Sequence, residues 1–365
     1  MIQRRHFLCA ASAAAFCLTT RTGFSATPMP SALGWSSQEI QTVPRGVSKR
    51  KPVVTGLSLQ PSGNLLAIVG DDHFVGLYDT KSQRFIEHLS QHTDWVRSAR
   101  FSPDSSALFT CGNDHRLIRW ETDELTVPAF SAKRKDAIIE MAISSDSKLV
   151  ATVGFNQSLV LHDAKTGKTA ARLTCPCNDN HSVAFSADNK LVAAGGRCGT
   201  LRVWDVESEK VVHNFKAHRR RIRALEFSEN GNLISTGDDQ MVRINKLNDP
   251  AQSTMLPRHA SKLFAVKTIA PSVIATSGSD NKIHIWNTLR GSEIGSLEKH
   301  TGTVSCLDAG QDVLVSGSFD TTVRIWTPNP NELAVVTPGF IDPKPASSFS
   351  ASKSPQSSGG WPSRR

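Results

Sequence analysis

Short apolar runs separated by turn-forming residues recur along most of the chain, and no helix-length amphipathic stretch lies between them. A representative unit has apolar runs at residues 96–101, 107–111 and 117–120, separated by a Ser-Pro-Asp-Ser turn and a Gly-Asn-Asp-His turn. Runs of this length bounded by Gly, Pro, Asn and Asp are typical of β-strands. The pattern therefore predicts an all-β protein in which each unit contributes about four short antiparallel strands.

One position recurs with a period in the low forties. The steps between successive copies are 42, 42, 42, 41, 41 and 40 residues, and the copies are Tyr78, Trp120, His162, Trp204, Asn245, Trp286 and Trp326. Six residues before each stand Asp72, Asp114, Asn156, Cys198, Asp239, Asp280 and Asp320. One small sheet cannot cover its own two faces, so the seven units over residues 53–327 are expected to pack against one another in a ring.

Two further features carry a resemblance to a known family. An Asp follows the recurring Trp in Trp204-Asp205, and a His opens four units, at His92, His218, His259 and His300. Over residues 53–327 the chain resembles WD40 proteins, which implies a seven-bladed β-propeller with four-stranded antiparallel blades. The last blade needs an outer strand from elsewhere, which residues 38–43 or, alternatively, residues 332–336 would supply.

The resemblance also implies a hydrogen-bonded chain of His, Ser or Thr, Asp and Trp inside each blade, which satisfies buried polar groups. Complete sets occur in the second blade (His92, Thr110, Asp114, Trp120), the sixth (His259, Thr276, Asp280, Trp286) and the seventh (His300, Ser316, Asp320, Trp326). The fifth blade has Asn245 in place of Trp, and the first has Arg50 where His is expected. Because the sets recur in separate blades and end on Trp, we interpret them as structural rather than catalytic.

Five cysteines lie outside the N-terminal 26 residues, and this odd number argues against a full disulfide framework. Cys111 and Cys306 fall within predicted strands, where each is expected to be a small buried side chain.

The other three cysteines fall in the fourth blade. Cys175 and Cys177 flank the position where a His is expected, and Cys198 replaces the Asp that this His would contact. We hypothesise a disulfide from Cys198 to Cys177 or, as a second choice, to Cys175, in an oxidising compartment. The alternatives are three free thiols, or a metal site completed by His181.

The loops that lead into the blades are rich in basic residues. They carry Lys49, Arg50 and Lys51 in the first blade, Lys133, Arg134 and Lys135 in the third, Arg219, Arg220, Arg221 and Arg223 in the fifth, and Arg258 and Lys262 in the sixth. A patch of this kind attracts acidic partners, whereas the alternative is a solvated rim without a partner. Trp95 is a candidate apolar anchor for a partner, or else packs over the central channel.

The two ends of the chain differ in composition from the repeats. Residues 1–26 resemble a twin-arginine signal peptide, with Arg4-Arg5 before an Ala-rich apolar stretch and possible cleavage after Ser25 or Ala26. This predicts a bacterial periplasmic or envelope protein; the alternative is a buried N-terminal helix. The stretch is too short to span a bilayer, so no transmembrane helix is expected. Residues 27–52 lead to the first unit, and the Ser- and Pro-rich residues 328–365 are predicted to be disordered.

Composition fits a globular protein, with 39% hydrophobic and 21% charged residues and a formal net charge of +9. The sequence favours a non-catalytic, exported interaction scaffold that is monomeric on its own, needs no cofactor or metal, and binds an acidic protein surface or an anionic envelope polymer. Nucleic acid is not expected, because no aromatic residues for base stacking are interleaved with the arginines. The alternative is a propeller enzyme or cofactor protein of the lactonase or quinoprotein type. Against it, no acidic cluster is expected at channel-facing positions.

Overall fold

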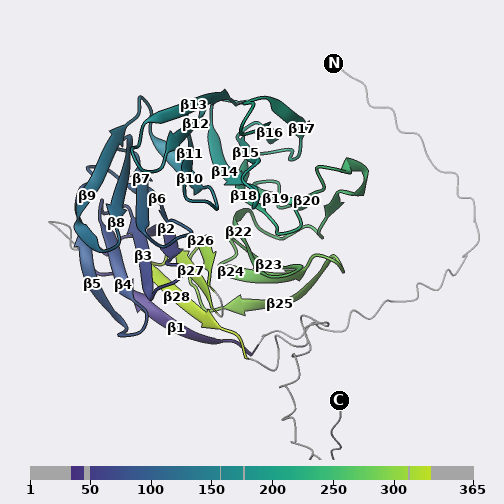
Figure 1. The fold of residues 1–365 in the computed structure, drawn as a ribbon. Coiled ribbons are helices and arrows are strands. Elements are labelled where there is room, and N and C mark those ends of the chain that lie inside the picture. Colours follow the sequence, from purple (N-terminus) through teal and green to yellow (C-terminus); the bar gives the residue numbers. More distant parts are fainter. Residues whose placement is uncertain (1–33, 45–49, 157, 176, 311–312, 330–365) are drawn as a thin grey trace, which may run out of the picture.

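The computed structural model describes residues 34–44, 50–156, 158–175, 177–310 and 313–329. The predicted signal peptide, Lys49, the alternative closing strand at residues 332–336 and residues 330–365 of the predicted disordered tail lie outside these ranges. Within them, seven four-stranded antiparallel sheets are arranged around a ring (Figure 1). This confirms the predicted seven-bladed β-propeller. No helix among the described residues has the length and apolarity needed to cross a bilayer.

The first three blades are built from consecutive strands. Blade one contains β2 (Val54–Leu59), β3 (Leu65–Gly70), β4 (Val75–Asp79) and β5 (Arg84–Leu89). Blade two contains β6 (Val96–Phe101), β7 (Ala107–Gly112), β8 (Arg116–Glu121) and β9 (Glu124–Lys133). Blade three contains β10 (Ile138–Ile143), β11 (Leu149–Gly154), β12 (Ser158–Asp163) and β13 (Thr169–Thr174).

The next three blades follow the same order. Blade four contains β14 (Asn180–Phe185), β15 (Leu191–Gly196), β16 (Thr200–Asp205) and β17 (Val211–Lys216). Blade five contains β18 (Ile222–Phe227), β19 (Leu233–Gly237), β20 (Val242–Asn245), the 3₁₀ turn η1 (Pro250–Gln252) and the short β21 (Thr254–Met255). Blade six contains β22 (Leu263–Ala270), β23 (Val273–Gly278), β24 (Lys282–Asn287) and β25 (Ser292–Glu298).

Blade seven combines the two ends of the described chain. It contains β26 (Val304–Ala309), β27 (Leu314–Ser318) and β28 (Thr322–Thr327), and β1 (Ser36–Gln41) is its outer strand. β1 pairs antiparallel with β28, with Ser36 opposite Thr327 and Gln41 opposite Thr322. The N-terminal segment therefore closes the ring, through a strand that begins two residues before the predicted residues 38–43.

The hydrophobic core lies between the blades. Each of the seven apolar clusters combines side chains from two adjacent blades. At the closure, Ile40 of β1 packs in the cluster that joins blades seven and one. Burial of apolar area is the main stabilising term in folding, so a blade gains most of its stability from its neighbours.

Every inner strand has a register irregularity two residues from its start, as between Val96 and Ser98 in β6. In blade two, Gly112 lies opposite Val96, and a Cβ atom at Gly112 would come within 2.2 Å of the Trp95 carbonyl oxygen. Glycine therefore permits the close approach of the two chains. A bulge at this place bends the strand locally and increases its twist.

Candidate functional site

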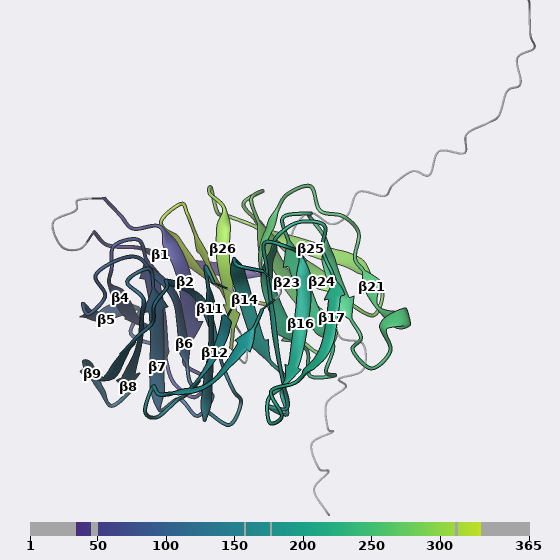
Figure 2. The same cartoon turned by 90° about the horizontal axis from the view of Figure 1, so that it is seen from above.

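The loops that lead into the inner strands lie on one face of the ring, beside the turns between second and third strands. Backbone hydrogen bonds join these two kinds of loop in several blades, for example from Asn113 N to Trp95 O at 2.9 Å and from Arg197 N to Asp179 O at 2.7 Å. We call this surface the loop face. Figure 2 shows the ring from the side, with the strands running between the two faces.

In blade two the predicted polar set forms a continuous chain below the loop face. His92 Nδ1 lies 2.8 Å from Asp114 Oδ2, and its Nε2 lies 2.8 Å from Thr110 Oγ1. Trp120 Nε1 donates to the same hydroxyl at 3.0 Å. Burial tends to raise the pKa of Asp114, but the hydrogen bond and charge of His92 lower it overall. Thr110 is 0% exposed, so its hydroxyl is out of reach of any substrate.

Blade seven repeats this arrangement, and blade five repeats it with one substitution. His300 lies 2.9 Å from Asp320 and 2.8 Å from Ser316, whose hydroxyl accepts from Trp326 at 2.8 Å. In blade five His218 lies 2.8 Å from both Asp239 and Ser235. There Asn245 Nδ2 donates to Ser235 Oγ at 3.2 Å, so the amide takes the place of the indole.

Blade six departs from the predicted set. Trp286 Nε1 donates to Thr276 Oγ1 at 3.1 Å, but Asp280 is bound by His284 Nε2 at 2.8 Å rather than by His259. The prediction that His259 contacts Asp280 was therefore wrong.

The reason is a second carboxylate: Glu293 accepts from His284 Nδ1 at 2.6 Å, so this imidazole is held on both sides. Burial lowers the pKa of His284, but Asp280 and Glu293 outweigh burial and raise it to about 9. His259 packs edge-on against His284, with 5.0 Å between the ring centroids, and burial and the charge of His284 lower the pKa of His259 to about 4.

Blades one and three use other polar contacts at the corresponding positions. The Arg50 guanidinium is paired with Asp71. In blade three His162 occupies the Trp position, and its Nε2 lies 3.1 Å from Thr152 Oγ1. Burial and the charge of Arg134 lower the pKa of His162 to about 4, so the imidazole is neutral at pH 7.

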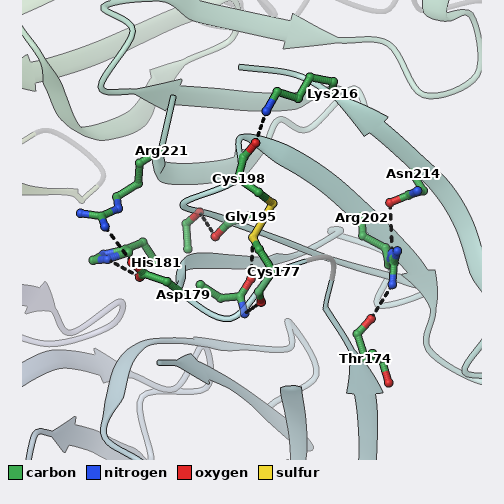
Figure 3. Close-up of a disulfide and its surroundings, with 12 residues drawn as sticks. Thr174, Cys177, Asp179, His181, Gly195, Cys198, Arg202, Asn214, Lys216 and Arg221 are labelled. Atoms are coloured by element: carbon green, nitrogen blue, oxygen red, sulfur yellow. Dashed lines mark hydrogen bonds and ion pairs between the residues drawn. A yellow bond between two sulfur atoms is a disulfide. The ribbon is translucent and has the colours of Figure 1, made fainter. Parts of the chain in front are cut away.

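In blade four a disulfide joins Cys177 to Cys198, with a Cα to Cα distance of 5.9 Å (Figure 3). Cys177 lies in the loop before the inner strand, where other blades carry the His of the polar set. Cys198 lies in the turn between the second and third strands, where they carry the Asp. Asn180 Nδ2 donates to the Cys177 carbonyl at 2.9 Å, and the Lys216 ammonium donates to the Cys198 carbonyl. The covalent bond stands where blades two, five and seven have a His to Asp contact.

Cys175, the second choice as a partner for Cys198, is a buried free thiol, as is Cys111. Cys306, the remaining free thiol in the described part of the chain, is half-buried. Burial raises the pKa of Cys175 and of Cys306 to about 12, which makes both poor nucleophiles. The hypothesis of a metal site with His181 finds no support: among the described residues no group of three or more His, Cys, Asp or Glu is placed to hold a metal ion.

The predicted basic loops divide into exposed and internally paired side chains. The exposed ones that the structure describes are Arg50, Lys51, Lys133, Lys135, Arg219, Arg220, Arg258 and Lys262. Three other arginines that were predicted to bind a partner instead contact residues of the propeller, so their prediction as free patch residues was wrong. Arg134 donates to Thr152 Oγ1 at 2.6 Å. Arg221 lies 2.7 Å from Asp179, and Arg223 lies 2.8 Å from Asp238. Burial lowers the pKa of Arg134 to about 10.

Trp95 is 39% exposed on the loop face, with the Arg97 guanidinium 4.9 Å from its ring centroid. Beside it, at the mouth of the channel, lies a hollow of about 200 Å³ whose lining includes Arg97, Phe155, His181, Arg223, Phe264 and Phe319. Phe155 is 52% and Phe319 46% exposed. No pattern in the sequence pointed to these phenylalanines, because only the fold brings the turns of blades three and seven to the same mouth of the channel.

The channel also contains charges that the sequence analysis did not anticipate. Arg100, Glu226, Lys267 and Asp308 line a cavity of about 300 Å³. Lys267 Nζ lies 3.1 Å from Asp308 and 3.6 Å from Glu226, and Arg100 lies 3.5 Å from Glu140. Carboxylates therefore face the channel, although none was expected there, and they belong to a mixed group that contains two cations, Arg100 and Lys267. All four lining charges occupy the fifth position of their inner strands, a recurrence that could have revealed them.

Comparison with known proteins agrees with the geometry. The family model for the WD domain, G-beta repeat, matches residues 83–121, 173–205, 209–244 and 291–327, so these four segments are similar to WD40 repeats. Over 110 residues it is 31% identical to the Sterol regulatory element-binding protein cleavage-activating protein of Xenopus laevis, a match covering 30% of this chain and 8% of that protein. It is 27% identical over 121 residues to Periodic tryptophan protein 2 of Arabidopsis thaliana, covering 32% and 13%.

A third relative is Eukaryotic translation initiation factor 3 subunit I of Eremothecium gossypii, which is 36% identical over 75 residues, covering 20% of this chain and 22% of that protein. The chain thus matches less than a quarter of the length of each of these curated relatives.

Proposed function

We propose that this WD40-repeat propeller is an exported, non-catalytic scaffold that binds an acidic protein partner through its loop face. WD40 propellers are typically protein-interaction scaffolds, and one relative is named as a subunit of a larger factor.

The distribution of charge on the loop face carries the proposal. Acidic side chains of this face are engaged internally: Asp71 with Arg50, Asp114 with His92, Asp179 with Arg221, Asp238 with Arg223, Asp239 with His218, Asp280 with His284 and Asp320 with His300. Lys133, Lys135, Arg219 and Arg220 meanwhile extend into solvent. The outward field of the face is therefore positive and favours encounter with acidic surfaces.

The aromatic hollow favours a protein as the partner. Exposed Trp and Phe side chains beside arginines are the composition of protein-binding hot spots. Here Trp95, Phe155 and Phe319 are exposed near the channel mouth, and the Arg223 guanidinium lies 4.9 Å from the Phe264 ring centroid. A partner side chain could be desolvated in this hollow while acidic residues contact the surrounding charges.

Export is supported by the twin-arginine-like start of the sequence and by the disulfide of blade four, because disulfides persist in oxidising compartments. Replacement of both Arg4 and Arg5 by Lys is expected to keep the protein inside the cell in a fractionation experiment. Unchanged delivery to the envelope would refute this route.

Affinity capture tests the binding face. The mature protein is used as bait in envelope extract at low and high salt, beside an Arg219→Glu/Arg220→Glu variant. Arg221 is left intact because its ion pair with Asp179 supports the fold. We expect an acidic protein that is retained at low salt and lost both at high salt and with the variant. A partner that binds the variant equally well would exclude the basic loop face.

A further inference from the structure

We infer that the rim shared by blades four and five is the docking site for an Asp- or Glu-rich segment of the partner, and that the Cys177–Cys198 disulfide holds this site in shape. The inference rests on the proposed function and assigns it to one sector of the loop face. We call the exposed side chains of Arg197, Lys216, Arg219 and Arg220 the blade four–five rim.

Three loops meet at this rim. Arg197 N donates to the Asp179 carbonyl at 2.7 Å, which ties the turn between β15 and β16 to the segment before β14. Ala217 N and His218 N both donate to the Gly199 carbonyl, at 3.0 and 2.9 Å, which ties the same turn to the loop before β18. The arginines of the rim therefore project from loops in direct backbone contact, and Lys216 is the last residue of β17 beside them.

Gly199 shows how closely these loops approach. Its φ is +69°, and a Cβ atom there would lie 2.2 Å from the His218 carbonyl oxygen and 2.5 Å from that of Arg220. Any larger residue would push the turn that carries Arg197 away from the loop that carries Arg219 and Arg220. The spacing between the arginines thus depends on this contact.

The arginines of the rim have no acidic partner of their own. Within the part of the chain that the structure describes, Arg197, Arg219 and Arg220 form no ion pair. The nearby carboxylates are occupied: Asp179 binds Arg221 at 2.7 Å and His181 at 2.9 Å (Figure 3). Guanidinium groups bind carboxylates in a bidentate manner, so three of them on touching loops fit a run of acidic side chains.

Other sectors of the loop face offer less. In blade one Arg50 is paired with Asp71 and Lys51 donates to Gln41 at 2.7 Å. In blade six Arg258 donates to Gln240 at 2.8 Å. The segment that leads from blade two into blade three presents Lys133 and Lys135, which are point charges without the planar geometry of arginine.

The disulfide links two of the three loops covalently. The Cys198 carbonyl accepts from the Lys216 ammonium (Figure 3). Cys198 also follows Arg197 directly in the chain, so two cationic residues of the rim are positioned through this cysteine. Blade four has Ala194 at the place of the hydroxyl in other blades, and therefore lacks their hydrogen-bonded chain. Reduction by an external dithiol, which yields two cysteine thiols and the oxidised dithiol, would free the turn that carries Arg197.

Fluorescence anisotropy with a short labelled oligoglutamate peptide tests the site. Relative to the wild type, we expect Arg219→Glu/Arg220→Glu to weaken binding about tenfold or more at low salt. The matched control is Lys133→Glu/Lys135→Glu, which makes the same change in net charge on the same face and is expected to weaken binding by less than about threefold. Thermal unfolding of each variant establishes that it is folded.

The second arm addresses the disulfide. Cys177→Ser/Cys198→Ser, or dithiothreitol added to the folded wild type, is expected to weaken peptide binding about threefold or more, whereas Cys111→Ser is expected to have no effect. Undiminished binding after complete reduction would show that the disulfide does not shape the site.

If both charge-reversal pairs weaken peptide binding equally, the blade four–five rim is not the docking site. The proposed function would still stand, with binding spread over the whole basic loop face. No weakening by either pair would refute the proposed function as well. Tighter binding of dextran sulfate than of the peptide, with the same dependence on the rim, would identify an anionic polymer instead and overturn the assignment to a protein segment.

Discussion

Single hydroxyl groups organise the interior of several blades. In blade two Thr110 Oγ1 contacts both the His92 imidazole and the Trp120 indole, and in blade seven Ser316 does the same for His300 and Trp326. A buried polar group without a partner is costly, so the loss of one hydroxyl affects two other groups.

Thr110→Val tests this role. The substitution keeps the shape of the side chain but removes the hydrogen-bond partner of His92 and Trp120, so we expect the free energy of unfolding to fall by about 2–4 kcal/mol. Thr110→Ser keeps the hydroxyl and is expected to lose only about 1 kcal/mol, for the missing methyl group. Urea unfolding followed by Trp fluorescence measures both; equal losses would mean that packing rather than hydrogen bonding matters.

Blade six should give the stability a distinct dependence on pH. The pKa of His284 is raised from 6.5 to about 9 in the folded state, so the imidazolium bound by Asp280 and Glu293 stabilises the fold fully below pH 6.5. This contribution, about 2 kcal/mol after allowance for solvent screening, is expected to be lost as the pH rises through 9. Thermal unfolding between pH 6 and 10 measures it, and in His284→Gln the alkaline loss should be absent.

At the residue scale, the sequence predicted the hydrogen-bonded positions that recur once per blade. It did not predict the contacts for which two side chains compete, such as the two histidines near Asp280. The period located Thr110 and Asp114, but it could not show that His284 takes Asp280 from His259, because that depends on Glu293 lying on an adjacent strand. The sequence also could not show that Arg134 points inward while Lys133 and Lys135 are exposed, since a Lys-Arg-Lys segment is compatible with either orientation of each side chain.

At the scale of elements, β1 is the strand whose partner, β28, lies farthest away in the sequence. It supplies the outer strand of blade seven, with Ile40 opposite Val323 and buried in the cluster that joins blades seven and one. The sequence showed that a closing strand was needed and offered two candidates. The sequence could not distinguish the two candidates, because a closing strand lies outside the repeated units and carries none of the residues that recur with the blade period.

Ile40→Ala is expected to lower the free energy of unfolding by about 2–4 kcal/mol, because it opens a cavity at the closure of the ring. Gln41→Ala, at the exposed next position of the same strand, should change it by less than about 0.5 kcal/mol. Chemical denaturation of both variants is the measurement. Similar values for the two would show that β1 contributes little to closure.

At the scale of the whole molecule, each apolar cluster joins two adjacent blades, whereas the charged side chains in the channel connect more than two. Lys267 of blade six contacts Glu226 of blade five and Asp308 of blade seven, and Asp308 accepts from the Leu59 backbone N–H of blade one at 2.9 Å. Burial tends to lower the pKa of Lys267, but Asp308 provides the largest effect and raises the pKa overall. The ammonium therefore stays charged and links three blades.

Lys267→Met should be strongly destabilising, by about 3 kcal/mol, because it removes the ammonium that contacts both buried carboxylates, Glu226 and Asp308. Lys282→Met in the same blade removes an exposed ion pair with Glu298 and should cost about 1 kcal/mol or less. Calorimetric unfolding of both variants compares the two pairs. A difference of less than about 0.5 kcal/mol would contradict a special role for the channel.

The pairing of β1 with β28 has a consequence for the order of events in the cell. Ser36 and Thr327, which face each other in blade seven, are 291 residues apart in sequence. During synthesis β1 must therefore wait until the chain has been made as far as β28 before its partner emerges, and the nascent ring stays open until then. The twin-arginine route proposed above, which carries folded proteins, would suit such a chain, since closure could then be finished before export.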